Sequence, residues 1–88
     1  AAEDLNATLE QAMRWLARRE YARAELQRRL RAKGHQADHI DTALQRLQDN
    51  GLQSDERFTE SFIRSRRQRG YGPLRIRAEL HERGVDKL

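Results

Sequence analysis

The stretch MRWLARREYARAELQRRLRAKG, residues 13–34, decides the fold, because it recurs without a gap as IRSRRQRGYGPLRIRAELHERG at residues 63–84. Five positions are identical in the two copies: Arg14/Arg64, Arg19/Arg69, Tyr21/Tyr71, Leu30/Leu80 and Gly34/Gly84. What recurs is an apolar scaffold that ends in a glycine, and this pattern is typical of proteins built from copies of one helical unit. Such repeats form a surface for a partner more readily than a pocket for a substrate.

Composition also favours a small binding domain over an enzyme. The 88 residues allow one compact domain or two very small ones, and 36% of them are hydrophobic while another 36% are charged. Most of the apolar side chains are therefore needed for the hydrophobic core, and few remain to line a site for a small-molecule substrate or a cofactor. Cysteine is absent, as is typical of a reducing compartment. No apolar run reaches the length of a membrane span, so we expect a cytoplasmic protein without a membrane partner.

The first unit is expected to contain three helices. Apolar residues at helical spacing predict a first helix from about Asp4 to Arg19. A second apolar face ends at Gly34, and glycine is favoured just past the end of a helix. Asp38 is the expected N-cap of a third helix, which stops at the DNG sequence of residues 49–51.

The second unit repeats the first two of these helices. Ser54 is the expected N-cap of a helix that runs to Gly70. Gly72 is then the N-cap of the next helix, with Pro73 at the first helical position, where its missing N–H costs nothing. Gly84 is expected to end this helix as Gly34 ends its counterpart.

The third helix of the second unit would begin near Asp86, after which only two residues remain. We therefore predict an all-α fold of tandem, helix-turn-helix-like three-helix repeats, with the first repeat at residues 1–52 and a truncated second repeat at residues 53–88. Since the chain also opens without an initiator methionine, we interpret it as a fragment of a longer protein.

Basic residues gather on the first two helices of each unit, although the net charge is only +4. Residues 64–77 contain six arginines and no acid, and these are the candidate contacts for an anionic partner: Arg64, Arg66, Arg67, Arg69, Arg75 and Arg77. For any single arginine, the alternative to a binding role is that its stem lies on a helix face and covers the core while its guanidinium stays in water. Six unpaired like charges are better explained by a partner. For Arg66, which follows Phe62 on one helical face, we expect a packed stem and a free guanidinium.

The segment DERFTESFIRSRRQRGYGPLRIRAELHERGV, residues 55–85, resembles the central block of the RecX regulatory-protein family. The shared features are the Arg-Phe pair at 57–58, a basic helix, GYGP at 70–73 and Ile-Arg at 76–77. Residues 12–34 resemble the preceding block of that family. Members are built from tandem three-helix repeats, usually three, so the resemblance implies that a third repeat is missing here.

By resemblance, the chain is a non-catalytic modulator of the RecA recombinase, with roles in homologous recombination, DNA repair and the SOS response. Family members bind in the groove of the RecA filament on single-stranded DNA and generally suppress strand exchange and ATP hydrolysis. The six arginines then become candidate contacts with the filament or the DNA. Arg57 also matches, but among the acids at its helix start we expect it to form a local salt bridge. This sequence departs from the family pattern at two positions. Ala22 stands where many members have a serine that caps the helix, and Leu74 stands where a basic residue is common.

Direct, sequence-nonspecific binding of nucleic acid is the alternative function, because basic three-helix units suit a groove. The third helix of the first unit, which would be the recognition helix, is acidic, and this argues against reading of bases. Binding to the phosphate backbone without base readout remains an alternative. We expect Tyr21, Tyr71 and Trp15 to be core or corner residues and not platforms for bases. A basic amphipathic helix also suits a membrane surface, but here the apolar faces are needed for the core.

Catalytic and metal-binding patterns are weak. His35 and His39 lie four residues apart near Asp38, but a third metal ligand is not evident, so we expect solvated side chains. His81 is expected to be isolated on an exposed helix. The serines lack a positioned histidine and acid, and the glycines end helices and do not form a phosphate-binding loop. We therefore expect neither an enzyme nor a cofactor.

Overall fold

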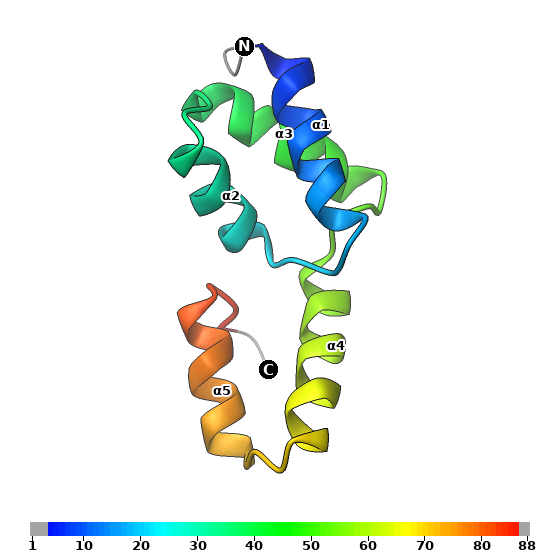
Figure 1. The fold of residues 1–88 in the computed structure, drawn as a ribbon, viewed down its shortest axis with the longest axis vertical. Helices are drawn as coiled ribbons and strands as arrows, with labels where there is room; N and C mark the ends of the chain where they lie inside the picture. Colours follow the sequence, from blue (N-terminus) through cyan, green and yellow to red (C-terminus); the bar gives the residue numbers. More distant parts are fainter. Residues whose placement is uncertain (1–3, 87–88) are drawn as a thin grey trace.

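A computed structural model describes residues 4–86 and shows five helices in that range, which confirms the all-α prediction. In chain order they are α1 (Leu5–Leu16), α2 (Arg23–Ala32), α3 (Ala37–Asp49), α4 (Asp55–Gln68) and α5 (Pro73–Glu82). Helices α1 to α3 pack together, and α4 and α5 form an antiparallel hairpin beyond one end of this bundle (Figure 1). The molecule is elongated, with extents of 42 × 21 × 20 Å.

Most of the predicted helix boundaries are confirmed. The Ser54 side chain accepts a hydrogen bond from the backbone N–H of Arg57 and so caps α4. Pro73 is the first residue of α5, directly after its N-cap Gly72. Gly34 and Gly84, at matching places in the two copies, have φ of 91° and 84°. Both helices therefore end in the left-handed conformation, which glycine adopts with least strain.

Two predicted helix ends are wrong. Helix α1 stops at Leu16, before Arg19, because the chain turns there and brings Tyr21 back against Trp15, with ring centroids 6.4 Å apart. Asp38 is not the N-cap of α3, since the helix starts at Ala37 after a tighter connection from α2. The Asp38 carboxylate instead accepts a hydrogen bond from the N–H of His39 in the first turn. Its negative charge there interacts favourably with the positive end of the helix dipole.

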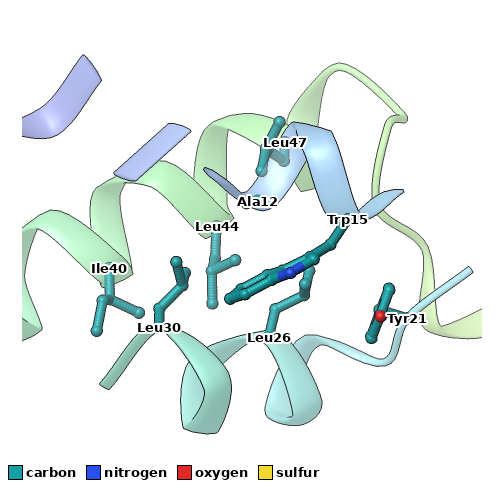
Figure 2. Packing of buried hydrophobic residues seen from close by; sticks show 8 residues of the cluster. All are labelled: Ala12, Trp15, Tyr21, Leu26, Leu30, Ile40, Leu44 and Leu47. Atoms are coloured by element: carbon teal, nitrogen blue, oxygen red, sulfur yellow. The ribbon is translucent and has the colours of Figure 1, made fainter. Parts of the chain in front are cut away.

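The bundle of α1 to α3 encloses the first hydrophobic core (Figure 2). Trp15 lies at its centre, between Leu26 and Leu44, and Tyr21 closes one end. Both aromatic side chains are buried, as expected from the sequence. The apolar stripes of three short helices therefore meet in one core, whose buried members are Ala12, Trp15, Tyr21, Leu26, Leu30, Ile40, Leu44 and Leu47.

A second core lies in the α4–α5 hairpin and extends into the first bundle. It joins Phe58 and Phe62 of α4 to Ile76 and Leu80 of α5, together with Ala22 from the start of α2. Ala22 offers no side-chain cap, but Glu25 accepts a hydrogen bond from its N–H, and Asp55 accepts one from the N–H of Arg23. Polar groups near the junction therefore satisfy the first amides of α2 in place of a capping serine.

Close packing and hydrogen bonds fix the junction between the two cores. A methyl group added at Gly84 would lie 2.5 Å from the Cβ of Ala24, so the end of α5 touches the start of α2. The buried Gln53 side chain donates hydrogen bonds to the carbonyl of Tyr21 and to Asp55. A boundary between residues 52 and 53 stays a prediction, and so does a third helix near Asp86, because residues 87 and 88 lie outside the described part.

Candidate binding surface

The six candidate arginines lie at the end of the α4–α5 hairpin that is farther from the first bundle (Figure 1). Arg64, Arg66 and Arg67 belong to the second half of α4, and Arg69 is its C-cap. Arg75 and Arg77 lie in the first half of α5. The turn of the hairpin thus brings together the two parts of the arginine-rich sequence.

Two of the six arginines are not free, which corrects the expectation of six unpaired charges. The Nε atoms of Arg66 and Arg75 both bind the carboxylate of Glu79, at 2.9 and 3.1 Å. The guanidinium of Arg66 also lies 4.2 Å from the centre of the Phe62 ring, and its side chain is only 19% exposed. Its stem is packed as expected, but its guanidinium already contacts Glu79 and the Phe62 ring, so Arg66 is not one of the unpaired charges.

The pKa of Glu79 is held below its ordinary value. The hydrogen bond from Arg66 is the largest cause, and the hydrogen bond from Arg75 and the two positive charges act in the same direction. Partial burial of the carboxylate opposes them by disfavouring its charged form. Glu79 therefore stays ionised at neutral pH and holds the two helices of the hairpin together.

This pKa predicts how the stability of the hairpin depends on pH. A carboxylate with a lower pKa in the folded than in the unfolded chain stabilises the fold above the unfolded value, which is about 4.3 for glutamate. The contribution is lost as the pH falls through the folded pKa. We expect Glu79→Gln to destabilise the protein at pH 7, and this deficit should shrink as the medium becomes acidic. Urea unfolding of both proteins over a pH series measures the difference.

The control for that series is Glu60→Gln, because Glu60 is an exposed carboxylate of α4, the other helix of the hairpin, and makes no ion pair among residues 4–86. It should change stability little at any pH. If Glu79→Gln lowers the free energy of unfolding by the same amount from neutral to acidic pH, the carboxylate does not act through its charge.

The other four arginines form what we call the exposed arginine group: Arg64, Arg67, Arg69 and Arg77. Within residues 4–86 they make no ion pair, and their side chains are exposed. Leu74, which is 81% exposed, lies at the start of α5 beside them in the sequence. The second half of α4, its C-cap and the first half of α5 thus present four cationic side chains and an apolar one, a combination that suits a partner surface.

Arg57 forms the expected salt bridge, but with an unexpected partner. Its Nε lies 3.0 Å from the carboxylate of Glu20, in the connection between α1 and α2, and its Nη2 donates to the carbonyl of Leu52. The acids at the start of α4 are not its partners. Arg57 therefore joins the hairpin to the first bundle and is not part of the exposed arginine group.

Arginines also cover the two repeated tyrosines. The guanidinium of Arg19 lies 3.6 Å from the centre of the Tyr21 ring, and that of Arg75 lies 3.7 Å from the centre of the Tyr71 ring. These cation–π contacts occupy a face of each ring. This arrangement supports the expectation that the tyrosines are structural and not platforms for bases.

Sequence reasoning missed Arg83, which lies outside the acid-free run. Its Nε is 3.7 Å from the carboxylate of Glu25 in α2, its Nη1 donates to the carbonyl of Glu79, and its guanidinium lies 4.8 Å from the centre of the Phe62 ring. The available signal was the basic pair Lys33/Arg83 at matching positions of the repeat.

The histidines show no metal site. Among residues 4–86, no group of three or more histidine and carboxylate side chains could hold a metal ion. His35 contacts the hydroxyl of the buried Thr8 through Nδ1 at 2.8 Å, so it is partnered and not solvated. His81 is exposed as expected, but it pairs with Asp86 and is not isolated. Within the same range, no helix is both long and apolar enough to cross a membrane.

The structure defines a class of small, all-helical proteins in which a three-helix bundle is followed by a related unit. Residues 9–47 match the model for the first three-helix domain of RecX, and residues 54–87 match the model for its second three-helix domain. The chain belongs to the RecX regulatory-protein family.

Curated relatives support this assignment. The chain is 58% identical over 74 residues to the regulatory protein RecX of Chromohalobacter salexigens, covering 84% of this chain and 49% of the relative. It is 54% identical over 76 residues to the protein of the same name from Pseudomonas entomophila, and 53% identical to that from Pseudomonas putida, in each case covering 86% of this chain and 49% of the relative. The chain thus spans about half the length of these relatives.

Proposed function

We propose that this chain contributes to regulation of the RecA recombinase by binding the RecA filament on single-stranded DNA. Bound there, it suppresses strand exchange and ATP hydrolysis without catalysing a reaction itself, and it acts in the cytoplasm. The exposed arginine group carries this proposal. Its four cationic side chains form no ion pair within residues 4–86, so their positive charges can attract an anionic partner.

The shape of the molecule supports inhibition by occupancy. A rod with extents of 42 × 21 × 20 Å can lie along a groove and exclude what the groove normally holds. Arg64, Arg67, Arg69 and Arg77 are the proposed contacts with filament or DNA, and Arg75, whose side chain is 61% exposed, can join them while bound to Glu79. Long-range attraction between these charges and an acidic or phosphate-lined groove speeds the encounter.

Sequence-nonspecific binding of nucleic acid is the second candidate function, and the same exposed guanidinium groups favour it, since arginine binds phosphate well. Reading of bases by α3 is disfavoured. That helix carries Asp38, Asp41 and Asp49 and buries its apolar side in the first core. The two candidates therefore differ in whether RecA is needed.

Binding to RecA filaments on single-stranded DNA, compared with binding to the same DNA alone at two salt concentrations, tests the proposal. We expect binding that requires the filament. Equal binding to bare DNA with a steep salt dependence would overturn the proposal in favour of a nucleic-acid-binding module.

A further inference from the structure

A cavity of about 250 Å³ begins at the junction between the first bundle and the hairpin and extends along α4 as far as Arg66. We call it the junction cavity. Its lining residues are Arg19, Glu20, Phe58, Ser61, Phe62, Ser65, Arg66 and Arg83. Its three guanidinium groups come from three separate segments: the connection after α1, the second half of α4 and the end of α5. It is smaller than a site for a drug-sized molecule, so it suits a small chemical group.

Contacts within the protein hold these guanidinium groups in place. Arg66 uses its Nε for Glu79, and Arg83 uses its Nε for Glu25 and its Nη1 for a backbone carbonyl. Arg19 lies against the Tyr21 ring, with Nη2 3.5 Å from the carboxylate of Glu25. A guanidinium has five N–H donors, so each arginine keeps donors for a ligand. Groups that are positioned in advance lose little entropy when the ligand binds.

The remaining lining groups favour an oxyanion. Ser61 and Ser65 lie one turn apart on α4, and their hydroxyls make no hydrogen bond to another residue within 4–86. Glu20 is the one carboxylate in the lining, and its charge is already paired with Arg57 at 3.0 Å. Cationic and hydroxyl donors thus converge from several directions. A tetrahedral anion has acceptors on all sides, whereas a carboxylate presents two oxygens in one plane.

We propose that the junction cavity binds a phosphate group, supplied either by a nucleotide or by the backbone of a nucleic-acid strand. Arg19, Arg66 and Arg83 donate to its oxygens, Ser61 and Ser65 add neutral donors, and the Phe62 ring forms an apolar wall. Because its arginines come from both sides of the junction, the bound phosphate also ties the first bundle to the hairpin. This site is separate from the exposed arginine group.

The test is a titration of the chain with inorganic phosphate, followed by ¹H–¹⁵N NMR that includes the arginine Nε–Hε signals. We expect saturable shifts of the Nε–Hε signals of Arg19, Arg66 and Arg83 and of the amides of Ser61 and Ser65. Sodium chloride at matched ionic strength should not reproduce them. The double variant Ser61→Ala/Ser65→Ala should bind phosphate about threefold to tenfold more weakly. Arg14→Gln, which removes an exposed arginine of α1 outside both the cavity and the exposed arginine group, should bind as the unchanged protein does.

Further titrations identify the source of the phosphate. Saturation by thymidine monophosphate, but not by oligothymidylate, assigns a nucleotide, whereas tighter saturation of the same signals by oligothymidylate assigns a strand. Shifts spread evenly over Arg64, Arg67, Arg69 and Arg77 would overturn the proposal. Equal affinity for acetate would also overturn it, because a carboxylate of a protein partner would then be the better ligand. None of these titrations contains RecA, so their outcome is independent of the proposed function.

Discussion

Replacing Gly84 with alanine is expected to lower the free energy of unfolding by about 2–5 kcal/mol, a large fraction of the stability of so small a domain. Two costs add. The residue has φ of 84°, a conformation that costs an L-amino acid about 1–2 kcal/mol. The new methyl group would also lie 2.5 Å from the Cβ of Ala24, and overpacking of this kind costs about 1–3 kcal/mol. Urea unfolding followed by Trp15 fluorescence and by circular dichroism measures the loss.

Gly34 provides the matched control, because it ends α2 as Gly84 ends α5. Its φ is 91°, but a methyl group added there would meet no atom within 4 Å. Gly34→Ala should therefore show the conformational cost alone, about 1–2 kcal/mol. Equal losses in the two variants would mean that the end of α5 does not press against α2, and the junction described above would be incorrect.

Neutralising the exposed arginine group, by Arg64→Gln, Arg67→Gln, Arg69→Gln and Arg77→Gln together, is expected to weaken binding to the RecA filament on the order of 100-fold. These side chains form no ion pair within residues 4–86, so their removal should leave the helices intact. Fluorescence anisotropy of the labelled chain measures the affinity, and circular dichroism checks the helical content.

The control removes the same charge elsewhere, by changing four exposed arginines of α1 to α3 and the connection after α1 to glutamine: Arg14, Arg18, Arg31 and Arg46. It should weaken binding only by about threefold, through the loss of general electrostatic attraction. Similar losses in both variants would show that net charge, and not the hairpin end, determines binding. A collapse of helical content in the first variant would assign its arginines to the structure instead.

Local signals in the sequence predicted most of the fold. Ser54, the Gly72–Pro73 pair and Gly84 each act through residues within a few positions along the chain, and such caps are readable from sequence. Periodic apolar residues predicted the core stripes for the same reason. The N-cap of α3 was missed because Asp38 is a good capping residue placed two positions inside the helix.

Contacts between distant segments could not be read in this way. Glu79 lies just outside the acid-free run, and its pairing with Arg66 spans 13 residues across the hairpin turn. The contact of Arg83 with Glu25 and the closeness of Gly84 to Ala24 depend on how the hairpin meets the first bundle. Sequence patterns therefore identified the arginines, but only the packing separates those that hold the structure from those that are exposed.

The rate of ATP hydrolysis by RecA on single-stranded DNA, measured as the chain is titrated, tests the central claim most directly. We predict that the rate falls to a plateau over the concentrations at which the chain binds the filament, and that the variant lacking the exposed arginine group leaves it unchanged. An unchanged rate at concentrations that saturate the filament would contradict the claim that this chain regulates RecA.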